Sequence, residues 1–257
     1  METKKALVRR PSSRMADGLL THIERTPIDF ELAERQWANY VDALHQAGWE
    51  TIEVAAADEL PDAAFVEDTA VVYNDLAVIT NPGADERKPE VVATEVELRK
   101  LGYRIAHITE PGTLDGGDVL KYGGHVYVGE GGRSNAEGIQ QLREALAPEG
   151  AEVHAVPLAK VLHLKTGVTA LPDGTIIGYE PLVDDVSYWG DRFLAVPEEG
   201  GAHVVIVGPK TVLMSTSGPG SIELIKSRGY DVLAVDISEF EKLEGCVTCL
   251  SVRLRGI

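Results

Sequence analysis

The sequence predicts an α/β fold in which five ββαβ units form a ring, as the blades of a propeller do. The first observation is a recurring pattern of a β-hairpin, a helix and a further strand, with a period of roughly 40–50 residues. The second is that the two ends of the chain supply strands of the fifth unit, so that both termini close one blade. A doubly wound sheet would alternate single strands with helices, and the hairpins argue against it.

Four hairpins open the first four units. Each joins two apolar segments through a short turn, and Asn-Asp, Gly-Gly and Asp-Gly in these turns tolerate the positive φ that tight hairpins need. We expect the hairpins at residues 65–79, 117–129, 161–179 and 204–215, with turns at residues 73–75, 123–124, 172–174 and 209–210.

A helix and a strand follow three of these hairpins. The helices are expected at residues 90–101, 134–146 and 221–228, and the strands at residues 103–108, 152–156 and 231–235. A glycine beyond each helix lets the chain leave it in a left-handed conformation. The third unit is weaker, because only a short helical segment at residues 183–189 precedes its strand at residues 193–196.

The fifth unit combines both ends of the chain. Strands are expected at residues 248–255 and 6–9, a helix with one apolar face at residues 30–45, and a last strand at residues 49–54. No linker or low-complexity segment divides the chain. We therefore expect a single propeller domain over residues 1–257.

The charge of the chain limits its partners. The 24 Lys and Arg residues against 41 Asp and Glu residues give a net charge of −17. Because this negative charge repels phosphate, we expect neither nucleic acid nor an anionic membrane as a partner. The same charge would attract a cationic ligand. Acidity that serves only solubility is the alternative interpretation.

The expected location is the cytoplasm. No apolar segment typical of a secretory signal follows the first residues. No apolar run approaches the roughly 20 residues that span a bilayer. Two cysteines do not make a disulfide framework, which favours a reducing compartment.

The two cysteines, Cys246 and Cys249, form a C-x-x-C pair near the C-terminus. A thioredoxin-like redox pair would begin a helix, whereas the alternating apolar residues after Cys249 indicate a strand. Structural zinc needs four ligands, and the sequence has no second pair of that kind. Two buried cysteines without chemistry are the remaining interpretation.

Acidic residues gather in two other segments. Adjacent Glu67 and Asp68 beside an apolar strand are costly unless a cation or hydrogen-bond donors pair them. In residues 115–118, two glycines between two aspartates let the backbone approach a ligand closely or hold a strained turn. A solvated strand end and a plain turn are the alternatives. His163 lies in an apolar segment and, taken alone, is typical of a buried structural histidine.

Four segments together resemble one enzyme family. They are residues 65–68 (Phe-Val-Glu-Asp), 113–120 (Thr-Leu-Asp-Gly-Gly-Asp-Val-Leu), 162–165 (Leu-His-Leu-Lys) and 241–251 (Glu-Lys-Leu-Glu-Gly-Cys-Val-Thr-Cys-Leu-Ser). In this order and spacing they are similar to the dimethylarginine dimethylaminohydrolase family of the guanidine-modifying, or pentein, superfamily. The resemblance extends from residue 6 to about residue 253. It implies a five-bladed α/β propeller, in agreement with the repeat pattern.

The resemblance also implies catalytic roles. Cys249 matches the nucleophile that attacks the central carbon of a guanidinium, which splits one difficult step into two. His163 matches the acid that protonates the departing amine and then the base that activates water. Asp115 matches the carboxylate that orients this imidazole, and Glu67 and Asp68 match the carboxylates that hold the guanidinium.

The amino-acid end of the substrate has its own implied partners. Arg87 and Arg133 match the two arginines that bind the α-carboxylate. Asp62, Leu19 and Leu243 match contacts to the α-amino end and to a lid over the pocket. The acidic Asp85 and Glu86 beside Arg87 depart from the family pattern, and we expect them either to pair with Arg87 or Lys88 or to repel a carboxylate.

These features predict hydrolysis of dimethylarginine or monomethylarginine to citrulline and a methylated amine through a covalent thiouronium intermediate, with no cofactor and no metal.

A deiminase or hydrolase of arginine or another guanidino compound is the alternative enzyme. A non-catalytic binding protein for arginine-like cations is an alternative that the complete set of catalytic residues argues against. A C-x-x-C redox protein would need Cys246 as well as Cys249. The expected partner is a small molecule, and a homodimer is left open.

Overall fold

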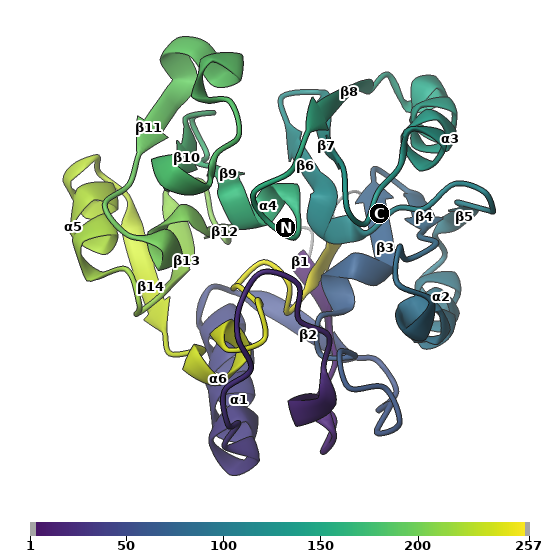
Figure 1. Cartoon of the computed structure of the whole chain (residues 1–257), viewed down its shortest axis with the longest axis horizontal. Helices are drawn as coiled ribbons and strands as arrows, with labels where there is room; N and C mark the ends of the chain where they lie inside the picture. Colours follow the sequence, from purple (N-terminus) through teal and green to yellow (C-terminus); the bar gives the residue numbers. More distant parts are fainter. Residues whose placement is uncertain (1–3, 255–257) are drawn as a thin grey trace.

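The computed structural model describes residues 4–254, which form five three-stranded sheets around a central axis (Figure 1). In every sheet the first two strands of the unit pair antiparallel, and the second and third pair parallel. The first four units hold β3 (Ala70–Tyr73), β4 (Leu76–Ile79) and β5 (Arg104–His107); β6 (Val119–Tyr122), β7 (His125–Glu130) and β8 (Glu152–Pro157); β9 (Val168–Ala170), β10 (Ile176–Gly178) and β11 (Phe193–Ala195); and β12 (Val205–Ile206), β13 (Thr211–Ser215) and β14 (Asp231–Val235). The predicted ring of five units is confirmed.

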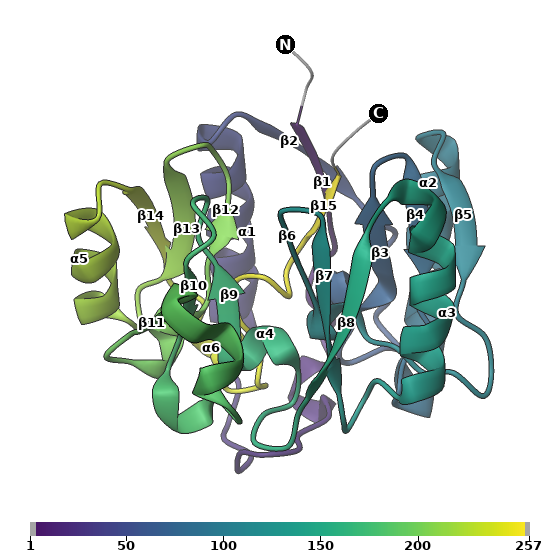
Figure 2. The same cartoon turned by 90° about the horizontal axis from the view of Figure 1, so that it is seen from above.

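The fifth sheet joins the two ends of the chain. β15 (Val252–Leu254) pairs antiparallel with β1 (Lys4–Val8), and β1 pairs parallel with β2 (Trp49–Glu53). Figure 2 shows β1 and β15 side by side. The strand predicted at residues 248–255 begins only at Val252, and residue 255 lies outside the described residues.

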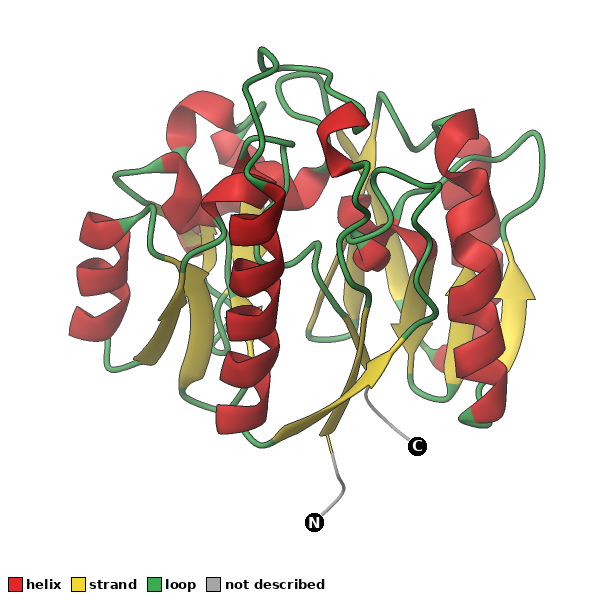
Figure 3. Ribbon diagram, turned by 90° about the horizontal axis from the view of Figure 1, so that it is seen from below, coloured by secondary structure: helices red, strands yellow, loops and turns green. Residues whose placement is uncertain are grey.

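Four helices connect the second and third strands of their units and stand outside the sheets (Figures 1 and 3). They are α1 (Phe30–Gln46), α2 (Val91–Lys100), α3 (Ala136–Leu146) and α5 (Pro219–Ser227). Asn135 caps α3 by accepting a hydrogen bond from Gly138 N, which satisfies a backbone donor at the helix start. The third unit has two short 3-10 helices, Glu180–Leu182 and Val186–Arg192, in the place of an α-helix.

Hydrophobic burial holds each helix on its sheet. Ile139 and Leu142 of α3 pack with Val126 and Val128 of β7, and all four are nearly inaccessible to solvent. Removing such apolar surface from water stabilises the fold by about 25 cal/mol per Å². The hairpin turn between β6 and β7 has the predicted positive φ. Gly123 adopts a φ of +58°, which a residue with a side chain adopts only under strain.

The segments that precede the first strand of a unit differ from the prediction. They are helical turns, and several predicted site residues lie in or next to them. The hairpins predicted from residues 65, 117 and 161 begin as strands only at Ala70, Val119 and Val168. Before each strand the chain forms a short turn of helix: Val66–Thr69, Gly116–Asp118, and α4 (Leu164–Gly167). The residues before β15 also form a turn, in which Cys249 N donates to Cys246 O (3.1 Å).

A cavity of about 670 Å³ follows the inner strands along the axis. It is lined by residues of β3, β6 and β9 and by the hairpin turns, including Asn74 and Gly123, at the end of the strands opposite these helical turns. Among residues 4–254, no helix has the length and apolar character needed to cross a membrane.

Candidate active site

A second, smaller cavity of about 20 Å³ brings most of the predicted site residues together. Its lining comes from the helical turns and from three loops. It comprises Leu19, Asp62, Phe65, Asp68, Arg87, Arg133, Leu162, His163, Leu243, Glu244, Gly245 and Cys249. Of the residues predicted for the site, only Glu67 and Asp115 lie outside this lining, and both contact residues around it.

The turn that carries Cys249 is fixed to its neighbour. Glu67 N donates to Cys249 O (3.1 Å), so the turn before β15 is tied to the turn before β3. The thiols of Cys249 and Cys246 are both free, and their sulfur atoms lie 3.3 Å apart. A strand follows the pair, which agrees with the sequence prediction and differs from the helix that follows a thioredoxin-like pair.

The two thiols compete for one negative charge. The hydrogen bond with Cys246, burial and the carboxylates Asp68 and Glu67 raise the pKa of Cys249. The same hydrogen bond lowers the pKa of Cys246, although burial opposes it. Without a cationic ligand the Cys249 thiol therefore keeps its proton, and a positive charge in the cavity would favour the thiolate.

His163 is held as an imidazolium by carboxylates. Its Nε2 lies 3.0 Å from Asp115 Oδ2, and its Nδ1 lies 3.9 Å from Asp68 Oδ1. Burial lowers the pKa of His163, but the charges of Asp68, Asp118 and Asp115 outweigh this and raise it to about 9. The ring therefore carries a proton to donate at neutral pH.

Asp118, for which the sequence motif predicted no role, fixes the loop of His163. Its Oδ1 accepts from Leu164 N (2.9 Å), and its Oδ2 accepts from the Ser134 hydroxyl (2.6 Å). Burial raises the pKa of Asp118 to about 7, even though the nearby imidazolium opposes the shift. Asp118 thus positions the residue that follows His163.

Asp68 lies between two cations. Arg87 Nη1 donates to its Oδ2 (2.6 Å), and Gly117 N donates to its Oδ1 (2.7 Å). Burial alone would raise the pKa of Asp68, but His163 and Arg87 outweigh burial and lower it to about 2. A Cβ on Gly117 would lie 2.6 Å from His163 Nδ1, so the backbone here approaches the imidazole closely, and its predicted approach to a ligand stays a prediction.

Arg87 is buried and its donors are occupied. Besides Asp68, the guanidinium donates to both carboxylate oxygens of Glu90 and to backbone oxygens. Glu90 is a residue that the sequence analysis did not assign. Of the two neighbouring acids, Asp85 pairs with Lys88 (2.7 Å), as expected, and Arg87 instead pairs with Asp68 and Glu90.

Arg133 keeps a free donor. Its Nη1 is buried and has no hydrogen-bond partner among residues 4–254, although Asp115 Oδ2 lies 3.7 Å away. A buried donor without an acceptor costs free energy unless a ligand supplies one. This atom lies in a cavity lining and is suited to bind an anionic group.

A strap, defined here as residues 18–25, borders the cavity through Leu19. Leu19 N donates to the Asp62 carboxylate (3.1 Å), and Thr21 N and His22 N donate to Glu244 (2.6 and 2.8 Å). Burial raises the pKa of Asp62. The role of Glu244, which has a positive φ of +59°, was not predicted from the sequence.

Glu67 faces the axial cavity and pairs with cations that the sequence analysis did not assign. Its Oε1 lies 2.6 Å from Lys165 Nζ and 3.3 Å from Arg253 Nη2. Burial raises the pKa of Glu67 despite these partners. Its Oε2 is buried without a hydrogen-bond partner among the described residues, which leaves an acceptor for a ligand.

Within residues 4–254, two groups of side chains have ligand atoms close enough to share a metal ion. One consists of Asp68, Asp115 and His163. The imidazolium already balances the two carboxylates in this group, and a metal would have to displace its proton. The other group, on β7 and β8, does not line the small cavity, although His125 lines the axial cavity at the end of the hairpin turns.

Two relatives of known name match the chain over nearly its full length. The chain is 58% identical over 257 residues to the N(G),N(G)-dimethylarginine dimethylaminohydrolase of Streptomyces coelicolor, and the match covers 100% of this chain and 99% of the relative. It is 33% identical to the enzyme of that name from Pseudomonas aeruginosa, over 97% of this chain and 99% of the relative. No family model matches the chain.

A solved structure has the same fold. The Pseudomonas aeruginosa enzyme, as a cysteine-to-serine variant in complex with citrulline, superposes with a TM-score of 0.91 and 32% identity. The match covers 99% of this chain and all of the other.

Replacing Asp115 tests the origin of the charge on His163. In Asp115→Asn one of the three carboxylates becomes neutral, so the pKa of His163 should fall from about 9 toward its ordinary value of 6.5. An NMR titration of the imidazole nitrogens measures this, with the remote Asp75→Asn as control. An unchanged His163 pKa in Asp115→Asn would contradict the assigned pairing.

The same pairing predicts a pH dependence of stability. Because the pKa of His163 is raised in the folded protein, the stabilisation from the imidazolium is complete below pH 6.5 and is lost as the pH rises through about 9. The difference in free energy of unfolding between the wild type and Asp115→Asn should shrink over that window.

Proposed function

The chain belongs to the dimethylarginine dimethylaminohydrolase family, and we propose on this basis that it hydrolyses N-ω-methylated arginine to citrulline and a methylated amine. The observation that supports this most directly is the cavity that holds Cys249, His163 and Asp68 together. A thiol, an imidazolium and a carboxylate are the groups that attack, protonate and orient a guanidinium.

The reaction proceeds in two halves. When the substrate binds, the Cys249 thiol loses its proton to solvent, and the Sγ thiolate attacks the central guanidinium carbon. The bond from that carbon to the methylated nitrogen breaks as His163 gives its proton to the departing amine. A thiouronium remains attached to Cys249. Water, deprotonated by the now neutral His163, then attacks the same carbon, releases the sulfur and leaves citrulline.

Substrate binding and thiol activation are coupled in this site. The hydrogen bond with Cys246 and burial raise the pKa of Cys249, and the carboxylates Asp68 and Glu67 raise it further. A guanidinium held against these carboxylates neutralises part of their charge and lowers the pKa of the thiol. Cys249 thus becomes a nucleophile mainly when its substrate is present, which protects the thiol between turnovers.

The two carboxylates contribute from different sides. Asp68 lines the smaller cavity, and its fixed position between Arg87 and Gly117 sets where the guanidinium lies. Glu67 approaches from the axial cavity, and its unpaired Oε2 is the acceptor available to the substrate. Asp115 acts through His163, because it holds Nε2 and leaves Nδ1 toward Asp68.

The amino-acid end of the substrate meets the outer part of the cavity. Arg133, with its free Nη1, binds the α-carboxylate, and Arg87 adds positive charge while it holds Asp68. Asp62 and the backbone at Leu19 and Leu243 contact the α-amino end. A cavity of about 20 Å³ is smaller than this substrate, so the strap opens for entry.

The same chemistry indicates the compartment. Cys246 and Cys249 lie 3.3 Å apart as free thiols, and an oxidising environment would join them and remove the nucleophile. We therefore assign the protein to a reducing cytoplasm, where its partner is a small methylated arginine rather than nucleic acid or a membrane.

Substitution of each cysteine separates a hydrolase from a dithiol redox protein. Cys249→Ser should reduce citrulline formation to background, because a hydroxyl is a far weaker nucleophile than a thiolate. Cys246→Ala should keep most of the activity. The assay measures citrulline from dimethylarginine, monomethylarginine, arginine and agmatine, and the methylated arginines should be preferred.

Equal loss of activity in both variants would refute the assignment of Cys249 as the single nucleophile. Preference for unmethylated arginine would favour the deiminase alternative.

Neutralising either carboxylate tests the guanidinium contacts. Asp68→Asn or Glu67→Gln removes a charged hydrogen bond worth about 1.5–3 kcal/mol, which weakens binding roughly ten- to hundredfold. Calorimetry with dimethylarginine in the Cys249→Ser background measures this without turnover. The exposed Asp75→Asn serves as control, and melting temperatures identify any variant that fails to fold. A folded variant that binds with wild-type affinity would remove that residue from the guanidinium site.

A further inference from the structure

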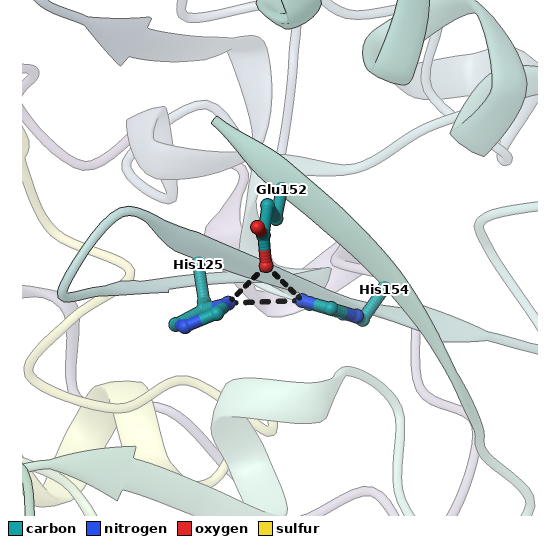
Figure 4. A group of neighbouring side chains, drawn as sticks. All are labelled: His125, Glu152 and His154. Carbon is teal, nitrogen blue, oxygen red and sulfur yellow. Dashed lines mark hydrogen bonds and ion pairs between the residues drawn. The ribbon is translucent and has the colours of Figure 1, made fainter. Parts of the chain in front are cut away.

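Three side chains on β7 and β8 point toward one another (Figure 4), and none of them lines the cavity that holds Cys249 and His163. His125 Nδ1 lies 3.1 Å from His154 Nε2 and 3.1 Å from Glu152 Oε2, and His154 Nε2 lies 3.9 Å from Glu152 Oε2. Two imidazole nitrogens and a carboxylate oxygen thus face one point. None of the steps derived above uses them.

Strand register creates this group. β7 and β8 pair parallel, with His125 opposite Glu152 and Tyr127 opposite His154. Residues two apart in a strand point to the same face, so all four side chains share one face of the sheet. His125 is the first residue of β7, at the end of the unit opposite the helical turn Gly116–Asp118.

Aromatic packing holds the imidazoles in place. The His154 ring stacks on Tyr127, with ring centres 5.2 Å apart and planes inclined by 25°. Tyr127 in turn packs edge-on against the buried Trp189 (5.2 Å), and Arg192 donates to its hydroxyl (3.3 Å). A ring fixed in this way loses little further freedom when its nitrogen binds a ligand.

The separations suit a shared metal ion. Neighbouring ligand atoms about 2.0–2.1 Å from one ion lie roughly 2.8–3.4 Å apart in octahedral or tetrahedral geometry. Two of the three separations fall in this range. The third closes with a small rotation of Glu152, whose side chain is 68% exposed. Nitrogen and carboxylate ligands favour zinc, nickel or copper over calcium or magnesium.

We propose that His125, Glu152 and His154 form a binding site for a divalent transition-metal ion such as Zn²⁺, independent of the hydrolase chemistry. Both histidines are more than a third exposed, so water completes the coordination. The ion joins the start of β7 to the start of β8, where the chain returns from α3 to the sheet. It acts as a clip that stabilises this unit against unfolding.

Calorimetric titration of the full chain with Zn²⁺, after treatment with a chelator, tests the site. The wild type should show a binding event that His154→Gln weakens at least about tenfold, and Glu152→Gln should weaken it as well. His107→Gln is the matched control, because His107 pairs with Glu95 (3.0 Å) without a second imidazole. Zn²⁺ bound by the active-site thiols would persist in all of these variants.

Thermal unfolding gives a second readout. Zn²⁺ should raise the melting temperature of the wild type and His107→Gln by more than that of His154→Gln, while all three melt alike in chelator. Citrulline formation without added metal should be unchanged in His154→Gln. If no Zn²⁺ binding is lost in His154→Gln, or if Zn²⁺ raises its melting temperature as much as that of the wild type, the three residues form a hydrogen-bonded group only and the proposal is wrong.

Discussion

The buried contact between Asp68 and Arg87 is the constraint on which the site depends. An unpaired carboxylate at this depth would be costly, so the site must supply cations to it. Arg87 pairs with one of its oxygens at 2.6 Å, and the His163 imidazolium faces the other. Asp115 and Glu90 then balance these cations from the far sides. The resulting alternation of charges fixes the positions of the groups that bind and protonate a guanidinium.

The repeated architecture explains how residues far apart in sequence reach this point. Each unit places the turn before its first strand at the same end of the axis, and Asp68, Asp118, His163 and Cys249 all lie in or next to such turns. The turn before the first strand therefore recurs in each unit at an equivalent position, and in several units it carries a different functional side chain. A hydrogen bond such as Glu67 N to Cys249 O then locks adjacent turns together.

Local patterns predicted the units well, because hairpin turns and helix ends depend on a few neighbouring residues. Gly123 has the expected positive φ, and α1 ends within one residue of its predicted bound. The helical turns before the first strands were missed, since their apolar residues resemble the start of a strand. Pairs such as Glu67 with Lys165, and the clamp from Glu244 to the strap, depend on how units meet, which no local pattern encodes. Without the family resemblance, the C-x-x-C pair alone is also compatible with a dithiol redox protein.

Direct capture of the intermediate tests the account most sharply. Cys246→Ala leaves Cys249 as the single cysteine of the chain. Rapid acid quenching of this variant during turnover of dimethylarginine, followed by mass spectrometry, should reveal an adduct equal to the substrate less its methylated amine, located on Cys249. Turnover at a normal rate with no adduct on that sulfur under any quench time would contradict covalent catalysis by this thiol.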